Sequence, residues 1–482
     1  MAALNFPLST VLNISISGTQ AAQSTLNTSN IAIFTRETNN PSFGTAAYKI
    51  YTSPTQVGLD FGTSSNTYAM ALAAYSQKPN FSGAGGYLVV IPFLTAAQDQ
   101  IVSLTFPGVP ATGTFELTYN SNSTSALTAS TLTAAAFQTA TRLVTGLTSA
   151  TITGSNAAGY TIDAGVTGIG HPFTISANSI ADANSVTVTP VITVTQPGST
   201  AETIDQAIIR TQNAIPYFGV LSAEIPSQIV MLAGAALIQT LNKIAFWPSF
   251  TAADLNVGGM LDLLRSGTLQ QSRGLYYGDV LATALGYAGA YAGRGMSTNF
   301  TGSNTTSTMQ LKALSTIQPD PSLTASQLVL ALAAGVDVYA NLGTNPVCIT
   351  SGNNDFFDNQ YNLQWLANQL QVNGINALAQ TGTKIPQTEG GMNTLKAAYR
   401  SGLEQAVTNG FLAPGTWNSA TTFGPGTDLA DNVANRGYYV YSSPVSAQSA
   451  ATRQTRAAPL VQLAAKFAGG IHSSSSIINV NP

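Results

Sequence analysis

The sequence is poor in charged residues, and this shortage limits the partners that the chain can have. Charged residues make up 8% of the 482 positions, whereas ordinary soluble domains carry roughly 25%. The 17 Lys and Arg residues are dispersed and the formal net charge is −3, so no basic stripe of the kind that binds nucleic acid is present. We expect no nucleic-acid partner. Charge depletion is also typical of buried subunit interfaces, which favours an assembling protein over one with a neutral polar coat.

Histidine and cysteine are almost absent, which argues against the commonest catalytic and metal sites. The two histidines, His171 and His472, lie far apart in the sequence without nearby ligand partners, so each is interpreted as a solvated or locally hydrogen-bonded side chain. The one cysteine, Cys348, lies in the apolar run "PVCIT" and cannot form an internal disulfide. We therefore predict no catalytic residues, no metal site and no cofactor.

Long apolar runs are also missing. The most apolar stretch, residues 229–247, contains Gln239, Asn242 and Lys243, and none reaches the roughly 20 residues of a membrane span. The opening "MAALNFPLST" lacks the basic and apolar regions of a signal peptide. We expect no membrane insertion and a protein that stays in the cytoplasm until it assembles or lysis releases it.

The pattern of helices and strands predicts an α/β fold, α+β overall, that is interrupted by an insert. Helix and strand signals alternate over residues 53–92 and resume near residue 201. Between them, short Thr- and Val-rich strands indicate a β-rich module. The predicted domains are an N-terminal arm at 1–20, a discontinuous α/β domain at 21–100 and 201–300, an inserted β-rich outer domain at 101–200, an α+β region at 301–458, and a C-terminal strand and arm at 459–482.

Within the 301–458 region, a strand is predicted at "TMQLKAL" (308–314) and two long helices at 357–380 and 389–409, the second capped by Gly410. The small residues of "GYAGAYAGRG" (286–295) predict a helix that packs closely on its neighbour.

One dense polar cluster, "SGNNDFFDNQYN" (351–362), contains the pair Asp355 and Asp358. Paired carboxylates serve in glycoside hydrolysis, and they can also be oxygen ligands for Ca²⁺. We favour a third interpretation, an Asn/Asp-rich turn in which Asp358 or Asn359 caps the following helix.

Both ends of the chain have strand propensity without an obvious partner, and unpaired strand edges do not stay free. The segments are "TVLNISISG" (10–18) and the end of the tail, which follows a Gly469-Gly470 hinge and four serines. The stretch 461–467 reads as a strand or, with Pro459 at its start, as a short helix. The candidate intersubunit contacts are Val11, Asn13, Ile14, Ser15, Ile16, Ile477, Ile478 and Val480.

Four stretches in the same order resemble the contractile tail sheath proteins of myophage-type bacteriophages. They are "YTSPTQVGLDFGTSSNTYAMALAAYSQKP", "GYAGAYAGRGMSTNF", "TGTKIPQTEGGMNTLKAAYRSGLEQAVTNGFLAPGTW" and "SAQSAATRQTRAAPLVQLAAKFAGGIHSSSSI". The resemblance covers most of the chain outside the insert and gives residues 101–200 no role.

Membership of this family implies a structural virion protein without enzymatic activity. The resemblance implies hexameric rings stacked helically around a tail tube, a single contraction that drives the tube through the host envelope for genome ejection, and contacts with tube, baseplate and neck proteins. It also implies that terminal arms add strands to sheets of neighbouring copies, with Gly469 and Gly470 as the arm hinge.

Two other classes share some of these features. A surface adhesin or surface-layer protein would have the low charge and the β-rich insert, but it normally carries an export signal. A phage depolymerase would be an enzyme with a repetitive β-solenoid and clustered carboxylates, and the sequence contains neither.

Overall fold

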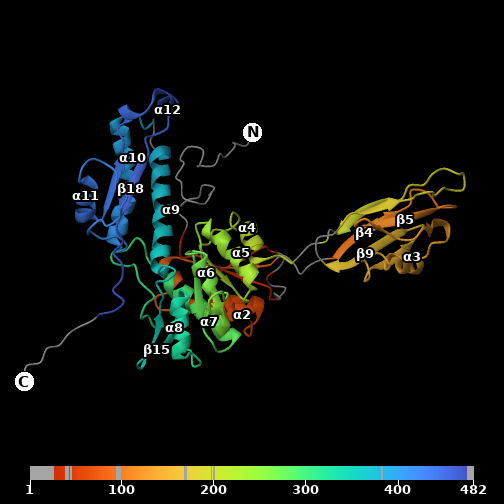
Figure 1. Cartoon of the computed structure of the whole chain (residues 1–482), viewed down its shortest axis with the longest axis horizontal. Helices are drawn as coiled ribbons and strands as arrows, with labels where there is room; N and C mark the ends of the chain where they lie inside the picture. The colour runs from red at the N-terminus through yellow and green to blue at the C-terminus, as the bar shows by residue number, and fades with distance from the viewer. Residues whose placement is uncertain are drawn as a thin grey trace, which may run out of the picture. The chain divides into compact units, whose positions relative to one another are not determined.

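The computed structural model describes residues 27–37, 43, 46–93, 99–167, 171–196, 198, 201–380 and 384–474. The chain separates into two compact units (Figure 1). Unit 1 comprises the residues up to Pro92 and from Ile204 onward, and unit 2 comprises Phe93–Thr203.

Unit 1 is built on an eight-stranded sheet in the order β16-β15-β14-β13-β12-β1-β3-β2. The six central strands run parallel, and the two edge strands β2 and β16 pair antiparallel. Most of the central strands are buried from end to end, as expected where helices cover both faces of a parallel sheet. The strands are β1 (Ile31–Thr35), β2 (Lys49–Tyr51), β3 (Leu88–Pro92), β12 (Gly219–Ser222), β13 (Ile244–Ser249), β14 (Ser272–Tyr276), β15 (Val336–Leu342) and β16 (Asn345–Ile349).

The helices that accompany this sheet include one pair in very close contact. Gly289 and Gly293 of α7 face the backbone of α2, where an added Cβ at Gly289 would lie 2.5 Å from the Met70 carbonyl oxygen. The predicted close packing of the 286–295 helix is therefore confirmed. The helices of this part are α1 (Pro54–Phe61), α2 (Asn66–Tyr75), α4 (Ile204–Thr211), α5 (Gln228–Gln239), α6 (Asp262–Ser266), α7 (Leu281–Gly295) and α8 (Ala325–Ala333).

Two long antiparallel helices dominate the C-terminal part of unit 1 (Figure 1). Asn373 Nδ2 donates to the Ala398 carbonyl oxygen at 3.1 Å, and Gly402 packs against Leu370. Both helices contribute to the same hydrophobic core as the sheet. The elements are α9 (Phe357–Gln380), α10 (Glu389–Thr408), α11 (Asp428–Arg436), β17 (Tyr438–Ser442), α12 (Ala450–Gln454) and β18 (Val461–Ala465).

Unit 2 is β-rich and has its own core around Phe115, Phe137 and Tyr160. Its sheets have the orders β10-β5-β6, with β7 also on β5, and β11-β4-β9-β8. The first and last strands pair, with Ile101 opposite Gln196, so the two ends of the insert lie side by side at these residues. The elements are β4 (Asp99–Thr105), β5 (Thr114–Tyr119), β6 (Asn122–Ser123), β7 (Leu127–Thr128), α3 (Ala134–Thr141), β8 (Thr151–Ser155), β9 (Gly159–Thr167), β10 (Phe173–Ser176) and β11 (Val191–Gln196).

The fold class, a discontinuous α/β core with an inserted β-rich domain, is confirmed, as are the two long helices and the Gly410 cap, whose φ is +87°. The sheet continues beyond residue 300 through β15 and β16, so that position is no boundary between sheets.

The predicted strand at 308–314 is wrong. Leu311 has a φ of +60°, and this left-handed residue interrupts the extended backbone beside Cys348.

Candidate functional site

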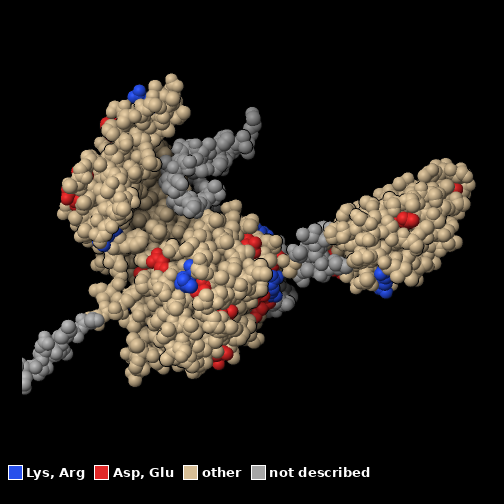
Figure 2. Space-filling model, in the orientation of Figure 1, with Lys and Arg blue, Asp and Glu red and all other residues tan. Residues whose placement is uncertain are grey.

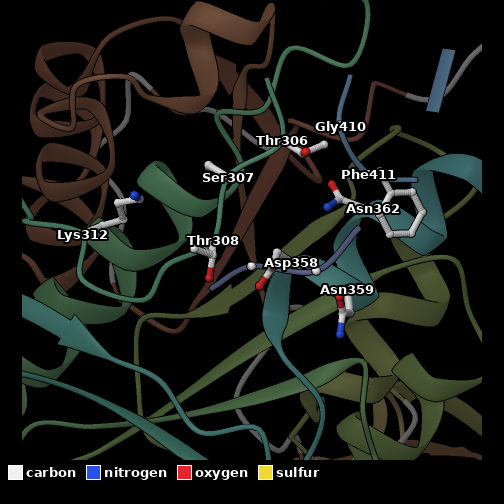
Figure 3. Close-up of a pocket in the computed structure, with 11 residues that line it drawn as sticks. Thr306, Ser307, Thr308, Lys312, Asp358, Asn359, Asn362, Gly410 and Phe411 are labelled. Atoms are coloured by element: carbon white, nitrogen blue, oxygen red, sulfur yellow. The ribbon is translucent and has the colours of Figure 1, made fainter. Parts of the chain in front are cut away.

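The described part of unit 1 contains a polar cavity of about 260 Å³, which lies at the start of α9 and the end of α10 (Figure 3). Four segments that are far apart in the sequence line it. They are the loop 306–312, the first turns of α9, the two residues after the α10 cap, and the glycine pair of the C-terminal segment. The lining residues are Thr306, Ser307, Thr308, Lys312, Asp358, Asn359, Asn362, Gly410, Phe411, Gly469 and Gly470.

The two carboxylates of the 351–362 cluster have different roles. The Asp355 carboxylate accepts from the Phe356 amide at 2.8 Å, from Asn359 Nδ2 at 2.7 Å and from Gln360 Nε2 at 2.7 Å. The Asp355 carboxylate therefore caps the N-terminal end of α9. The capping interpretation is right in kind but was placed on the wrong residue, because the helix already begins at Phe357 and both Asp358 and Asn359 lie inside it.

Asp358 and Asn362 present acceptors to the cavity from one face of α9, since they are four residues apart. Burial raises the pKa of the Asp358 carboxyl, against the opposing effects of His472 and of a hydrogen bond with Thr308. Asn362 is only 4% exposed, and its Oδ1 has no hydrogen-bond partner among the described residues. No cation in the described part of the chain forms a salt bridge with Asp358. Asn362 Oδ1 is therefore the buried acceptor of the lining that has no partner among the described residues, whereas Asp358 hydrogen-bonds with Thr308 and has no ion-pair partner there.

The C-terminal segment crosses this region and forms one wall of the cavity. The Ala468 amide donates to the Phe411 carbonyl oxygen at 2.8 Å, and the Phe467 ring lies 4.8 Å from that of Phe411. Further on, His472 Nε2 lies 3.0 Å from Thr308 Oγ1, and its ring packs edge-on against Phe356 at 4.5 Å. The interpretation of His472 as a locally hydrogen-bonded histidine is confirmed.

Comparison with known families identifies this region. Residues 357–480 match the family model described as E217 tail sheath protein gp31-like, C-terminal domain. This part of the chain is similar to a tail sheath domain. The resemblance that the sequence indicated is thereby confirmed for these residues, which we call the sheath domain.

Two solved structures resemble the whole chain. The sheath tail protein Lin1278 from Listeria innocua is 10% identical, with 93% of this chain and 97% of that chain covered and a TM-score of 0.39. The helical sheath of the anti-feeding prophage in its contracted state is 9% identical, with 98% and 97% covered and a TM-score of 0.48. A comparison with proteins of curated function gives no match.

The sheath domain ends in a two-stranded antiparallel ribbon of β17 and β18, so the 461–467 stretch is a strand rather than a helix. Among the described residues, neither strand has a second partner. Rings of Phe423, Tyr439 and Tyr441 stack along one side, with centroids 5.8 to 6.3 Å apart. The chain directly after β18 bridges to Leu412 through Phe467, and a strand edge without a ladder partner is where a further strand can pair.

A buried ion pair joins the sheath domain to the sheet of unit 1. Arg273 on β14 pairs with Asp337 on β15, and their side chains are 3% and 0% exposed. The guanidinium also donates to the carbonyl oxygens of Ser351 and Asp355, just before α9, at 2.6 Å each. Tyr291 donates to Asp337 at 2.6 Å. Because its donors and acceptors are paired, this network fixes the start of α9 relative to the sheet.

Of the remaining predicted site residues, the two hinge glycines are described by the structure and the arm residues are not. Gly469 and Gly470 line the cavity, and Gly469 adopts a φ of +68°. The arm residues Val11, Asn13, Ile14, Ser15, Ile16, Ile477, Ile478 and Val480 lie outside the described residues.

Within the described ranges, no three His, Cys, Asp or Glu side chains are grouped so that they could hold a metal ion. His171 contacts the ring of Tyr119 with centroids 5.5 Å apart. In the same ranges no helix has both the length and the apolar character needed to cross a bilayer.

Sequence reasoning missed Asn362, Thr308 and Lys312 as parts of one site. Each stands in a polar or mixed stretch, and nothing in the local pattern distinguishes it from a surface residue. A usable signal was the 351–362 cluster itself, which marked the correct end of α9.

Proposed function

We propose that this protein is the structural subunit of a contractile tail sheath, which polymerises as stacked hexameric rings around a tail tube. The match of residues 357–480 to a tail sheath domain carries the proposal. In the proposed cycle, contraction drives the tube through the host envelope without chemistry at this protein. The subunit assembles in the host cytoplasm, becomes part of the virion, and contacts the tube, baseplate and neck proteins.

The charge distribution supports a polymer of many copies. Few Lys, Arg, Asp or Glu atoms show on the visible face of the molecule (Figure 2), and the chain has 17 basic and 20 acidic residues in 482. Surfaces with few charges lose little solvation when they pack against each other, and identical copies repel each other weakly.

The β17–β18 ribbon is the proposed acceptor for strands from neighbouring copies. Residues 10–18 and 477–480 are the proposed donors, with Gly469 and Gly470 as the hinge. Strand addition supplies main-chain hydrogen bonds that persist while rigid bodies rotate. The Arg273–Asp337 network supports rigid-body movement because it couples the sheath domain to the sheet.

Negative-stain electron microscopy of the purified full chain tests the proposal. We expect striated hollow tubes. A flat lattice would indicate a surface-layer protein, and compact trimers would indicate a depolymerase, so either would refute the sheath assignment.

A truncation tests the exchanged tail. Deleting residues 473–482 leaves the contacts of His472 with Thr308 and Phe356 in place, so we expect folded protein with nearly normal melting that forms no tubes. Normal tubes from this truncation would contradict strand donation by the tail.

A further inference from the structure

The cavity at the start of α9 has the composition of a binding site for a cationic group. Asp358 and Asn362 line a volume of about 260 Å³ together with polar groups that include Lys312, and the buried Asn362 Oδ1 has no partner among the described residues. A guanidinium supplies five N–H donors in a rigid planar fork and a charge that matches the carboxylate. A buried acceptor without a donor, such as Asn362 Oδ1, is costly, so a cationic group that donates to it and pairs with the Asp358 carboxylate would be bound favourably.

The sheath domain carries a matching basic turn at its opposite end. Arg453 and Arg456 flank the end of α12, both are exposed, and neither takes part in a salt bridge within the described chain. Gln387 Nε2 and Gln448 Nε2 donate to the Ala457 carbonyl oxygen at 2.9 and 3.2 Å. These bonds hold the basic turn, residues 453–456, beside the start of α10.

The two features cannot meet within one copy. The helices α9 and α10 are antiparallel, so the start of α10 lies at the end of α9, far from the cavity (Figure 1). The 24 residues of α9 span roughly 36 Å at about 1.5 Å per residue. An acceptor site at one end and a donor at the other are complementary only between different copies of the chain.

We propose that the basic turn of one copy inserts an arginine guanidinium into the cavity of the next copy. Such a head-to-tail contact is heterologous, and repetition of it builds an open helix or a ring rather than a closed dimer. The guanidinium forms a charge-assisted pair with Asp358 and donates to Asn362. The inference rests on the proposed function, since it names one contact by which sheath subunits assemble.

The proposed contact depends on where the C-terminal segment lies. Gly469 and Gly470 form a wall of the cavity, and His472 fixes the segment through Thr308 and Phe356. The cavity is therefore complete only while the segment lies on its own sheath domain, so occupation by arginine favours that position of the segment.

The test measures the critical concentration for polymerisation by sedimentation. We compare the wild type with Asp358→Asn and with the pair Arg453→Gln and Arg456→Gln. A hydrogen bond to a charged group contributes enough for about a tenfold or greater rise in critical concentration in each case. Because both changes remove the same contact, the combined variant is expected to be no worse than either alone. Lys384→Gln, which neutralises an exposed charge before α10, is the matched control and should have no effect.

Cross-linking gives a second readout that does not depend on affinity. The only native cysteine, Cys348, is buried, so cysteines introduced by Ser307→Cys at the cavity and Arg456→Cys on the turn report their own positions. A short bismaleimide should give a ladder of linked copies from the polymer and none from dilute subunits. Circular dichroism and melting curves confirm that each variant is folded.

Several outcomes would overturn the inference. Unchanged polymerisation of Asp358→Asn, additive effects of the two changes, or a polymer without the cross-linked ladder would show that the cavity holds only water. In those cases tubes still form and the proposed sheath function stands. Failure of the wild type to polymerise under any condition would instead refute the proposed function and this contact with it.

Discussion

Lys243 makes the stability of unit 1 rise with pH, which is the opposite of the effect of an ion-paired lysine. Its side chain is 6% exposed, Nζ donates to the Tyr217 carbonyl oxygen at 2.7 Å, and the amine lies 3.7 Å from the centroid of the Tyr217 ring. Burial lowers the pKa of Lys243 to about 7. In the unfolded chain the pKa returns to the ordinary value near 10.4.

The sign follows from proton counts. Between about pH 7 and pH 10 the unfolded chain binds a proton at Lys243 that the folded chain does not bind, so the free energy of unfolding rises with pH. At roughly 1.4 kcal/mol for each unit of pH, the increase from pH 7 to 8.5 is about 1.5 to 2 kcal/mol. Above about pH 8.5 this increase is opposed, because burial raises the pKa values of Cys348 and of several tyrosines, and these groups ionise first in the unfolded chain.

Urea unfolding followed by tryptophan fluorescence measures this increase. All three tryptophans, Trp247, Trp365 and Trp417, belong to unit 1, so the signal does not include unfolding of the insert. The wild type should gain stability from pH 7 to 8.5 at constant ionic strength, and Lys243→Met, which keeps the length but cannot titrate, should lose that gain. A wild type whose stability is flat or falls over this interval, or a methionine variant that keeps the slope, would refute the reasoning.

Three further predictions use the same unfolding assay or microscopy. Arg273→Met should destabilise unit 1 by roughly 3–5 kcal/mol because it leaves Asp337 charged and buried, and adding Asp337→Asn should recover part of the loss; an effect below about 1 kcal/mol would contradict the role of the network. Gly293→Ala should cost about 1–3 kcal/mol, since its Cβ would lie 2.6 Å from Ala74 Cα. Gly286→Ala on the same helix meets only Ile317 at 3.6 Å and should be neutral or stabilising, so equal losses in both would argue against the α2–α7 contact. Replacing unit 2 by a short Gly/Ser linker should leave both the tryptophan transition and tube formation intact, and soluble subunits that no longer form tubes would show that the insert is required.

The features that were predictable from the sequence are those with a local physical cause. The α10 helix has a left-handed glycine after its last turn, and the α7 helix has glycines four residues apart on one face. Each pattern is visible within a few consecutive residues of the sequence. The insert is recognisable because its Thr- and Val-rich strands differ from the alternating helices and strands around it.

The features that were not predictable depend on residues that meet only in the folded chain. Arg273 and Asp337 are 64 positions apart, and each alone looks like an ordinary surface charge. The cavity joins the loop at 306–312 to α9, the end of α10 and the C-terminal segment. At 308–314 the apolar residues suggested a strand, but the left-handed Leu311 is compatible with the same letters and breaks it.

The scarcity of charge gives the remaining charges a larger role than their number indicates. Arg273, Asp337 and Lys243 are buried inside unit 1, which removes them from the surface and leaves still fewer exposed charges to repel a second copy. Weak repulsion allows association but does not select a geometry, because neutral polar surfaces pack in many registers. In the proposed contact, the partly buried Asp358 carboxylate at one end of the sheath domain and the exposed guanidinium groups of Arg453 and Arg456 at the other supply that selection, since an unpaired charge penalises every wrong arrangement. In the proposed polymer, the low charge that weakens repulsion between copies therefore requires a few directional contacts to make the assembly regular.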